Sequence, residues 1–140
     1  MTQLYFAYGA NLNVEEMSYR CPGAVPVHSF VLTGWQLLFS HVATIVPAYD
    51  GQGVPGAIWA ITDTCEDSLD GFEGYPYLYT KKYLETTAGK LMFYVMHDVE
   101  TGKPPSLSYL NTITRGYADW GLDQAYLDQA VEQCRNANLK

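Results

Sequence analysis

The segment from Ala24 to Thr62 constrains the fold most, because it has the composition of several short strands. It contains four runs rich in β-branched and aromatic residues, which read VPVHSFVLTGW, QLLFS, ATIVPAY and VPGAIWAIT. Glycines and one Asp-Gly pair separate these runs, as turn residues separate consecutive strands. Pro47 and Pro55 lie within the runs and indicate strand edges or bulges. The sequence therefore predicts a β-rich first half.

The last third of the chain has a helical pattern instead. Ser106 can cap a helix that runs to about Trp120, and Gly121 is a suitable residue to end it. Asp123 can cap a final helix. The expected apolar face of that helix consists of Tyr126, Leu127, Ala130, Val131 and Cys134. Strands first and helices last indicate an α+β fold, and we expect residues 1–140 to form a single domain.

Four smaller elements complete the expected fold. The apolar run at residues 3–8 predicts a buried strand, and the N-x-x-E pattern at Asn13 predicts a helix to about Arg20. A second helix is expected from Cys65 to about Phe72, with Thr64 as its cap. Residues 79–87 and 91–97 predict a β-hairpin.

Charge and hydrophobicity exclude several functional classes. The net charge is -7, and the 8 Lys and Arg residues are scattered rather than gathered in a stripe, so we expect no nucleic-acid partner. The same balance argues against binding to an anionic membrane surface. No apolar run reaches the ~18 residues of a spanning helix. The N-terminus lacks the basic region of a signal peptide, so we expect a cytoplasmic protein.

The cysteine and histidine pattern indicates neither a disulfide scaffold nor a metal site. The 3 cysteines are widely spaced without a CxxC pair, so free buried thiols are expected. No zinc-ligand spacing is present. A hydrolase elbow, G-x-S-x-G, is also absent. Cys65 with His97 is a candidate nucleophile pair, but Glu66 and Asp67 beside the thiol would oppose a thiolate.

The segment YGANLN, at residues 8–13, is the first candidate binding site. A strand ends at Gly9 and a helix begins soon afterwards, so consecutive backbone N–H groups can face outward and bind a carboxylate or a phosphate. The segment is not a P-loop, because the lysine of that motif is missing. The alternative is an ordinary strand-to-helix turn, which has the same free N–H groups.

Glu73 is the second candidate, because its neighbours in LDGFEGYPYLYTKK are mostly aromatic. Gly74 and Pro76 predict that it lies in a turn after a helix. Poor solvation raises the pKa of a carboxyl group, and a glutamate with a pKa near neutrality can accept a proton and return it. The alternative is an exposed glutamate at a helix end, beside a tight turn.

Tyr79 and Tyr109 form the third candidate group. A buried phenol needs a hydrogen-bond partner, so such residues often orient ligands. Most of the 12 tyrosines must belong to the core or to a rim, and a purely structural role is the alternative for each of them.

Together these motifs resemble the γ-glutamylcyclotransferase-like family. Members of that family begin with a strand that ends in YGSN, and this chain has YGANL at residues 8–12. They carry a glutamate in the pattern LDxFEGxPxxY, which is matched here by LDGFEGYPYLY at residues 69–79. One branch also has PSxxY before a helix and a GL turn, which corresponds to residues 105–109 and Gly121-Leu122.

The resemblance covers about residues 4–127, with two departures. Ala10 stands where the family usually has Ser, so any hydrogen bond from that hydroxyl is lost here. Asp123 follows Gly121-Leu122 where Pro is common. The resemblance therefore defines the two main motifs better than it defines the walls of the pocket. The walls determine which leaving group the pocket accepts.

The resemblance implies a fold and a reaction. The fold is a small, mixed, barrel-like β-sheet flanked by helices. The reaction is an intramolecular aminolysis that converts a small-molecule γ-glutamyl substrate to 5-oxoproline and a free amine or amino acid, with Glu73 as general acid and base. No metal or cofactor is required. The implied substrate-binding residues are Tyr8, Gly9, Ala10, Asn11, Leu12, Tyr79 and Tyr109.

Two alternatives stay open. A related enzyme could act on a γ-glutamyl-lysine isopeptide, a γ-glutamylated intermediate or glutathione, because ring closure is common to all of them. A non-catalytic binding or regulatory domain could keep the pocket, because fold alone does not establish activity. The sequence does not fix the oligomeric state, and a homodimer is compatible with it.

Overall fold

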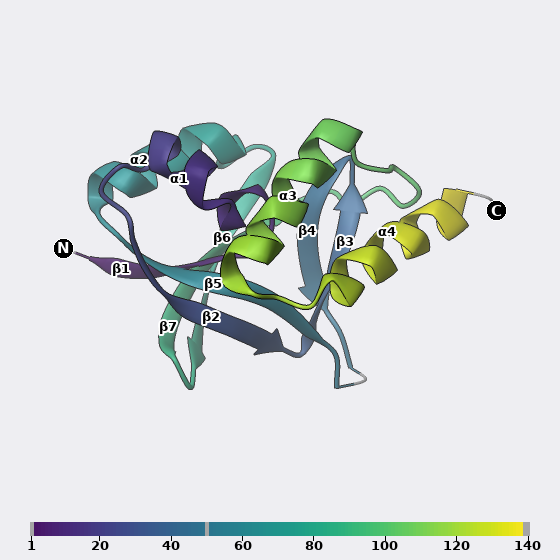
Figure 1. Cartoon of the computed structure of the whole chain (residues 1–140), viewed down its shortest axis with the longest axis horizontal. Helices are drawn as coiled ribbons and strands as arrows, with labels where there is room; N and C mark the ends of the chain where they lie inside the picture. The colour runs from purple at the N-terminus through teal and green to yellow at the C-terminus, as the bar shows by residue number, and fades with distance from the viewer. Residues whose placement is uncertain (1, 50, 139–140) are drawn as a thin grey trace.

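The largest element of the structure, a computed structural model that describes residues 2–49 and 51–138, is a five-stranded mixed sheet (Figure 1). Its order is β2 (Val25–Thr33), β5 (Gly53–Ile61), β1 (Gln3–Ala7), β7 (Gly89–Met96) and β6 (Tyr79–Thr86). Strand β1 lies in the centre, antiparallel to β5 and parallel to β7. The turn that follows β1 therefore starts from the middle of the sheet.

A separate hairpin of β3 (Trp35–Ser40) and β4 (Val42–Pro47) runs steeply across the direction of β2 and β5 (Figure 1). It is tied to the large sheet by a side-chain hydrogen bond, because the backbone N–H of Met96 donates to Thr44 Oγ1 at 2.9 Å. This contact joins β4 to the end of β7 and positions β4 beside the turn after β1.

The helices are a short 3-10 turn η1 (Ala10–Leu12), α1 (Val14–Arg20), α2 (Asp63–Glu73), α3 (Leu107–Trp120) and α4 (Gln124–Asn138). Two caps follow the sequence prediction: Asn13 accepts from the Glu16 amide, and Ser106 accepts from the Tyr109 amide. None of these helices in the described residues is both long enough and apolar enough to cross a membrane.

Helix α2 begins earlier than expected. Thr62, not Thr64, is the cap, because it is the first residue after strand β5 and its extended backbone lets Oγ1 accept from the Cys65 amide at 3.2 Å. The helix also continues one residue beyond Phe72, so Glu73 is its last residue rather than part of the turn. Gly74 then ends the helix with φ 66°, a left-handed conformation that glycine adopts without steric cost.

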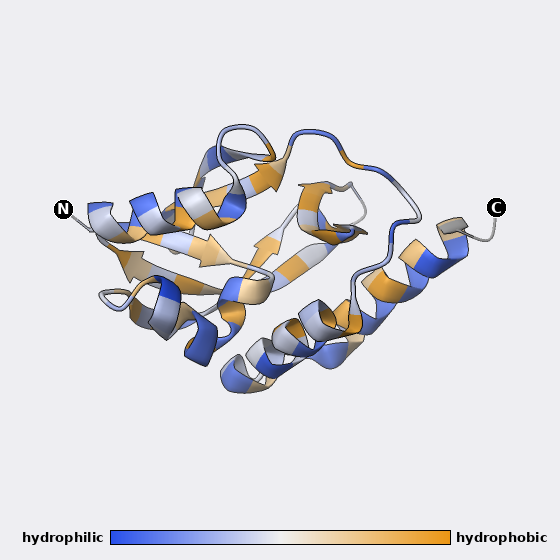
Figure 2. Cartoon of the chain, turned by 90° about the horizontal axis from the view of Figure 1, so that it is seen from above, coloured by the Kyte–Doolittle hydropathy of each residue, from blue (hydrophilic) through white to orange (hydrophobic). Residues whose placement is uncertain are grey.

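Apolar side chains cover both faces of the large sheet. On one face of β1, Phe6 packs edge-on against Phe93 and belongs to a cluster that includes residues of α3, α4 and the β3–β4 hairpin. On the other face, Tyr5 belongs to a cluster with residues of α1 and α2. Figure 2 shows the hydrophobic residues concentrated on the strands, whereas hydrophilic residues colour much of the helices. A central strand buried on both faces explains the unbroken apolar run at residues 3–8.

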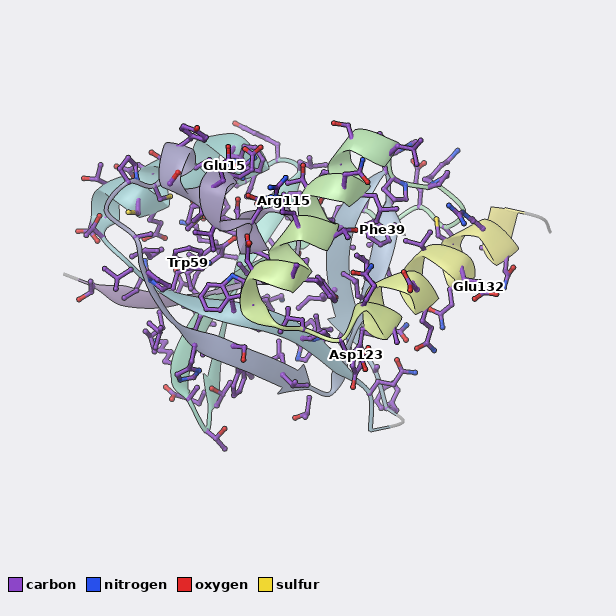
Figure 3. All side chains as sticks on the ribbon, viewed as in Figure 1. Glu15, Phe39, Trp59, Arg115, Asp123 and Glu132 are labelled. Atoms are coloured by element: carbon purple, nitrogen blue, oxygen red, sulfur yellow. The ribbon has the colours of Figure 1, made fainter. Side chains whose placement is uncertain are left out.

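The expected α+β fold, a mixed sheet flanked by helices, is confirmed. The predicted strands and the hairpin at β6–β7 are present, with ends within a few residues of those expected. On α4, Leu127, Ala130, Val131 and Cys134 are buried as predicted, whereas Tyr126 is 43% exposed. On β5, Trp59, labelled in Figure 3, packs edge-on against Trp120 at the end of α3 with ring centroids 5.4 Å apart.

Candidate active site

A cavity of about 210 Å³ lies where the turn after β1 meets β4, the end of α2, β6, β7 and α3. Among the residues that the structure describes, Glu73 is the only carboxyl group in its lining. Around it are Gly9, Ala10 and Asn11 of the turn, and the side chains of Tyr5, Tyr8, Tyr79, Tyr94 and Tyr109. The cavity therefore combines one acid group with backbone amides and neutral phenols, and no Lys or Arg lines it.

Glu73 reaches the cavity because α2 ends at this residue and Gly74 turns the chain away. Its side chain is partly buried. Burial raises the pKa of the Glu73 carboxyl to about 7, and the nearby positive charge of Arg20 limits the rise. The alternative of a freely exposed helix-end glutamate therefore does not describe this residue.

The turn η1 brings backbone amides to the same cavity. Leu12 N–H donates to the Gly9 carbonyl at 3.0 Å and Asn13 N–H to the Ala10 carbonyl at 3.1 Å. Within residues 2–49 and 51–138, the amides of Ala10 and Asn11 have no acceptor, as expected for the first amides of such a turn. These two amides are the ones left to bind a ligand.

Leu12 corrects the sequence prediction, because it does not line the cavity. Its side chain is fully buried in the core, and its amide already has the Gly9 carbonyl as acceptor. Its own carbonyl accepts a hydrogen bond from Trp120 Nε1 at 2.8 Å. Leu12 thus anchors the turn to α3, whereas Gly9, Ala10 and Asn11 face the cavity.

The Asn11 side chain connects the turn to Glu73. Its Nδ2 donates to Tyr5 OH at 2.9 Å and to Glu73 Oε1 at 3.3 Å, while its Oδ1 accepts from Arg20 Nη1 at 2.8 Å. Asn11 is 3% exposed, so each of these contacts lies largely away from solvent. Tyr5 and Arg20 were not singled out from the sequence, because neither lies in a recognisable motif.

Tyr79 and Tyr109 both hydrogen-bond the backbone of one residue of strand β4, Ala43. Tyr79 OH donates to the Ala43 carbonyl at 2.5 Å, and Ala43 N–H donates to Tyr109 OH at 3.0 Å. The Tyr79 proton is thus already used, which leaves that oxygen as an acceptor, whereas the Tyr109 proton is still available. Ala43 has no side-chain feature that could have pointed to this role.

Tyr8 contributes a wall rather than a free hydroxyl. Its OH donates to the Tyr94 carbonyl at 2.7 Å, and its ring is 7% exposed. Tyr94 in turn donates its own OH to Asp70 Oδ1 at 2.6 Å. Burial raises the pKa of both phenols well above the usual range, so they are neutral at physiological pH.

Cys65 lies outside this cavity, in the first turn of α2, and is 3% exposed. Burial acts to raise the pKa of its thiol, but hydrogen bonds with Thr62 outweigh burial and lower it. All 3 cysteines are free and buried. No cluster of metal-binding side chains occurs among the described residues.

Comparisons with known proteins agree on one family. The family model "Gamma-glutamyl cyclotransferase, AIG2-like" matches residues 5–114. The mouse (Mus musculus) gamma-glutamylcyclotransferase is 32% identical over 91% of this chain and 77% of its own length. The human (Homo sapiens) gamma-glutamylcyclotransferase is 30% identical over 90% of this chain and 76% of its own.

Solved structures give the same result. One described as "Gamma-glutamyl cyclotransferase" superposes with a TM-score of 0.79 at 28% identity, over 93% of this chain and 86% of its own. A yeast cyclotransferase described as specific to glutathione shares the fold with a TM-score of 0.59, over 99% of this chain and 100% of its own, at 11% identity. Because the family model covers most of the chain and a curated relative exceeds 30% identity, this chain belongs to the γ-glutamyl cyclotransferase, AIG2-like family of enzymes.

Proposed function

We propose that this enzyme converts a γ-glutamyl amine or γ-glutamyl amino acid to 5-oxoproline and a free amine, with Glu73 as general acid and base. Family membership supports cyclotransferase activity in general. The observation that carries the mechanism is the position of Glu73, which among the described residues is the only carboxyl group in a cavity otherwise lined by neutral phenols, apolar side chains, Asn11 and backbone.

The reaction needs only groups of the substrate and a proton carrier. The α-amino nitrogen of the γ-glutamyl group attacks the γ-carbonyl carbon, which forms a C–N bond and closes a five-membered ring. The C–N bond to the leaving amine then breaks. The attacking ammonium loses two protons in all, and both end on the leaving nitrogen, which departs as an ammonium group, so atoms and charge balance. Nucleophile and electrophile belong to one molecule, so holding it folded supplies a high effective concentration.

Glu73 suits the transfer of that proton. A carboxyl group with a pKa of about 7 is ionised often enough to accept the ammonium proton and acidic enough to return it at neutral pH. In this scheme the ionised carboxylate binds the substrate ammonium first. It then deprotonates the nitrogen and protonates the departing amine.

The remaining polar groups suit the rest of the substrate. The free amides of Ala10 and Asn11 are donors for the γ-carbonyl oxygen or for the α-carboxylate. Tyr109 has an uncommitted proton and can act as a further donor, whereas the Tyr79 oxygen can accept from the ammonium. Ala10 offers no hydroxyl, so the backbone alone must serve at that position.

The leaving group is the open part of this proposal. Phe72 and Leu78 line the cavity and are 48% and 50% exposed, so its rim is apolar. The structurally similar yeast protein is described as specific to glutathione, but its low identity carries only the fold to this chain. A panel of γ-glutamyl amino acids, γ-glutamyl-lysine and glutathione, assayed for 5-oxoproline, would identify the preferred amine.

The direct test is Glu73→Gln, which removes the proton carrier and keeps the shape. We expect 5-oxoproline release to fall by about 10²- to 10⁴-fold, since general acid–base catalysis contributes that much. The matched control is Glu15→Gln, the same change at an exposed position on α1 outside the cavity (Figure 3). Circular dichroism spectra should match for all three proteins.

Two outcomes would contradict the proposal. Unchanged turnover in Glu73→Gln would remove Glu73 from its role. Thermal stabilisation of the wild type by γ-glutamyl compounds, with no product from any of them, would favour a binding or regulatory domain that keeps the pocket.

A further inference from the structure

Arg20 lies behind the cavity and does not line it, yet it contacts two residues that do. Its Nη1 donates to Asn11 Oδ1 at 2.8 Å, and its guanidinium carbon lies 3.6 Å from the centre of the Phe72 ring. On its outer side Nη2 is 3.4 Å from Glu16 Oε2. The end of α1 is therefore joined to the turn η1 and to the end of α2 through one side chain.

The contact with Arg20 decides which way the Asn11 carboxamide points. A guanidinium has only donors, so the Asn11 atom that faces it must be the oxygen. The amide nitrogen is then directed to Tyr5 OH and to Glu73 Oε1. If the carboxamide were flipped, its oxygen would face Glu73. This oxygen would repel an ionised Glu73 carboxylate but could accept a hydrogen bond from a protonated one.

We propose that Arg20 is a positioning residue that holds the Asn11 carboxamide with its N–H toward Glu73, and so keeps Glu73 ionisable at neutral pH. This role rests on the proposed function of the same cavity. Arg20 acts through Asn11 and through its own charge, and it touches no substrate atom. Both actions favour the ionised form of Glu73, whereas burial opposes it.

The other groups around Glu73 cannot substitute for Arg20. The titratable groups that face it from the other elements are the phenols of Tyr5, Tyr8, Tyr79, Tyr94 and Tyr109. Burial raises the pKa of each of them, so they carry no charge at neutral pH. Within α2 itself, Asp70 is paired with Lys81 at 2.9 Å. Loss of the Arg20 charge should therefore change the pKa of Glu73 most directly.

The test is the pH profile of kcat/KM for Arg20→Gln. We expect its acid limb to move to higher pH by ~1 unit or more, as follows from losing an opposite charge and a donor. Activity at pH 7 should then fall by roughly fivefold or more and recover at higher pH. Arg20→Lys retains a charge and a donor, so its limb should move less than that of Arg20→Gln.

Glu16→Gln is the matched control, because it removes only the outer partner of Arg20 and leaves the contacts to Asn11 and Phe72. Its pH profile should match the wild type. A rate for Arg20→Gln that falls equally at all pH values would overturn the proposal, because a merely structural defect gives that pattern. If Arg20→Gln does not fold, Arg20→Lys carries the same test with a smaller expected shift.

A readout without turnover separates this inference from the proposed function. Side-chain carboxyl NMR of Glu73 in wild type and Arg20→Gln reports its titration directly. We expect the midpoint to rise in the variant, and an unchanged midpoint would refute the role of Arg20. A wild type that forms no 5-oxoproline would refute the proposed function and leave this comparison decisive for Arg20.

Discussion

At the scale of single residues, Tyr79 and Tyr109 bind the backbone of the same residue, Ala43, but one hydroxyl is a donor there and the other is an acceptor. Tyr79 donates to the Ala43 carbonyl, and Tyr109 accepts from the Ala43 amide. A hydroxyl that donates to the protein has no proton left for a substrate oxygen, whereas one that accepts keeps it. The two phenols therefore differ in what they can offer a ligand.

This difference predicts unequal effects of Tyr79→Phe and Tyr109→Phe. Each variant leaves one polar group of Ala43 unpaired, so each should lose about 1–3 kcal/mol of unfolding free energy. Tyr109→Phe should in addition lower kcat/KM by about 10- to 100-fold, because it removes a donor for a charged oxygen. Urea titrations and steady-state 5-oxoproline assays on both proteins measure the two quantities.

Each phenol serves as the control for the other, since both changes delete one hydroxyl that bonds the backbone of Ala43. Equal losses of kcat/KM with equal losses of stability would mean that both tyrosines act only on β4. A larger loss of kcat/KM for Tyr79→Phe than for Tyr109→Phe would contradict the role of the Tyr109 proton as a donor to the substrate.

At the scale of elements, helix α3 and the turn η1 pack with no space between their backbones. A Cβ at Gly116 of α3 would lie 2.5 Å from Leu12 Cβ and 2.8 Å from the Asn13 nitrogen. Asn13 also donates from Nδ2 to the Thr112 carbonyl at 3.1 Å. Only glycine allows this approach, which places Tyr109 at the start of α3 within reach of the cavity.

We therefore expect Gly116→Ala to disturb the site from a distance. The added methyl group should push η1 and α3 apart, at a cost of about 1–3 kcal/mol that offsets the gain in helix propensity. Misplacing the amides of Ala10 and Asn11 should lower kcat/KM by up to about 100-fold. Asn111→Ala, at an exposed position on the same helix, is the control and should change neither quantity appreciably.

The elements themselves could be predicted well from local signals. The Asn13 and Ser106 caps, the glycine stop at Gly121 and the apolar face of α4 all act through neighbouring residues, so the sequence shows them directly. The start of α2 was misjudged because Thr62 and Thr64 are equally good caps by type. Where strand β5 ends decides between them, and that depends on pairing with β1 and β2.

The residues of the candidate site also divide into those indicated by local sequence and those that depend on contacts between distant segments. Glu73 and the turn could be proposed as site residues from the sequence because motif and aromatic context lie close together along the chain. Arg20, Tyr5 and Ala43 could not, because they reach the cavity or its lining residues through contacts between distant segments. The error at Leu12 has the same origin, since only packing against α3 shows that its amide and side chain face the core.

At the scale of the whole molecule, Glu73 links proton uptake to global stability. Its pKa is raised from 4.5 to about 7 on folding, because burial disfavours the charge. The native state then binds more protons than the unfolded state between these values, so stability falls as pH rises through this window. The contribution of protonated Glu73 to the free energy of unfolding is fully present below about pH 4.5 and is lost above about pH 7.

Glu73→Gln should remove this pH dependence, because glutamine does not titrate. The unfolding free energy of the variant relative to wild type should rise between pH 4.5 and 7, by on the order of 3 kcal/mol. Above pH 7 the difference should be flat. Urea unfolding of both proteins across this range measures it, and Glu15→Gln should follow the wild type. A constant difference at all pH values would mean that Glu73 titrates alike in both states.

Two phenols of the cavity, Tyr79 and Tyr109, also bear on the tendency of the protein to aggregate. Among the described strands, β4 pairs only with β3, and on its other edge the N–H and the carbonyl of Ala43 bond Tyr109 and Tyr79. An unpaired strand edge is a template on which foreign polypeptides can add and aggregate. Tyr79 and Tyr109 thus occupy a position at which another strand could otherwise add, so substitutions of these pocket residues should also increase aggregation.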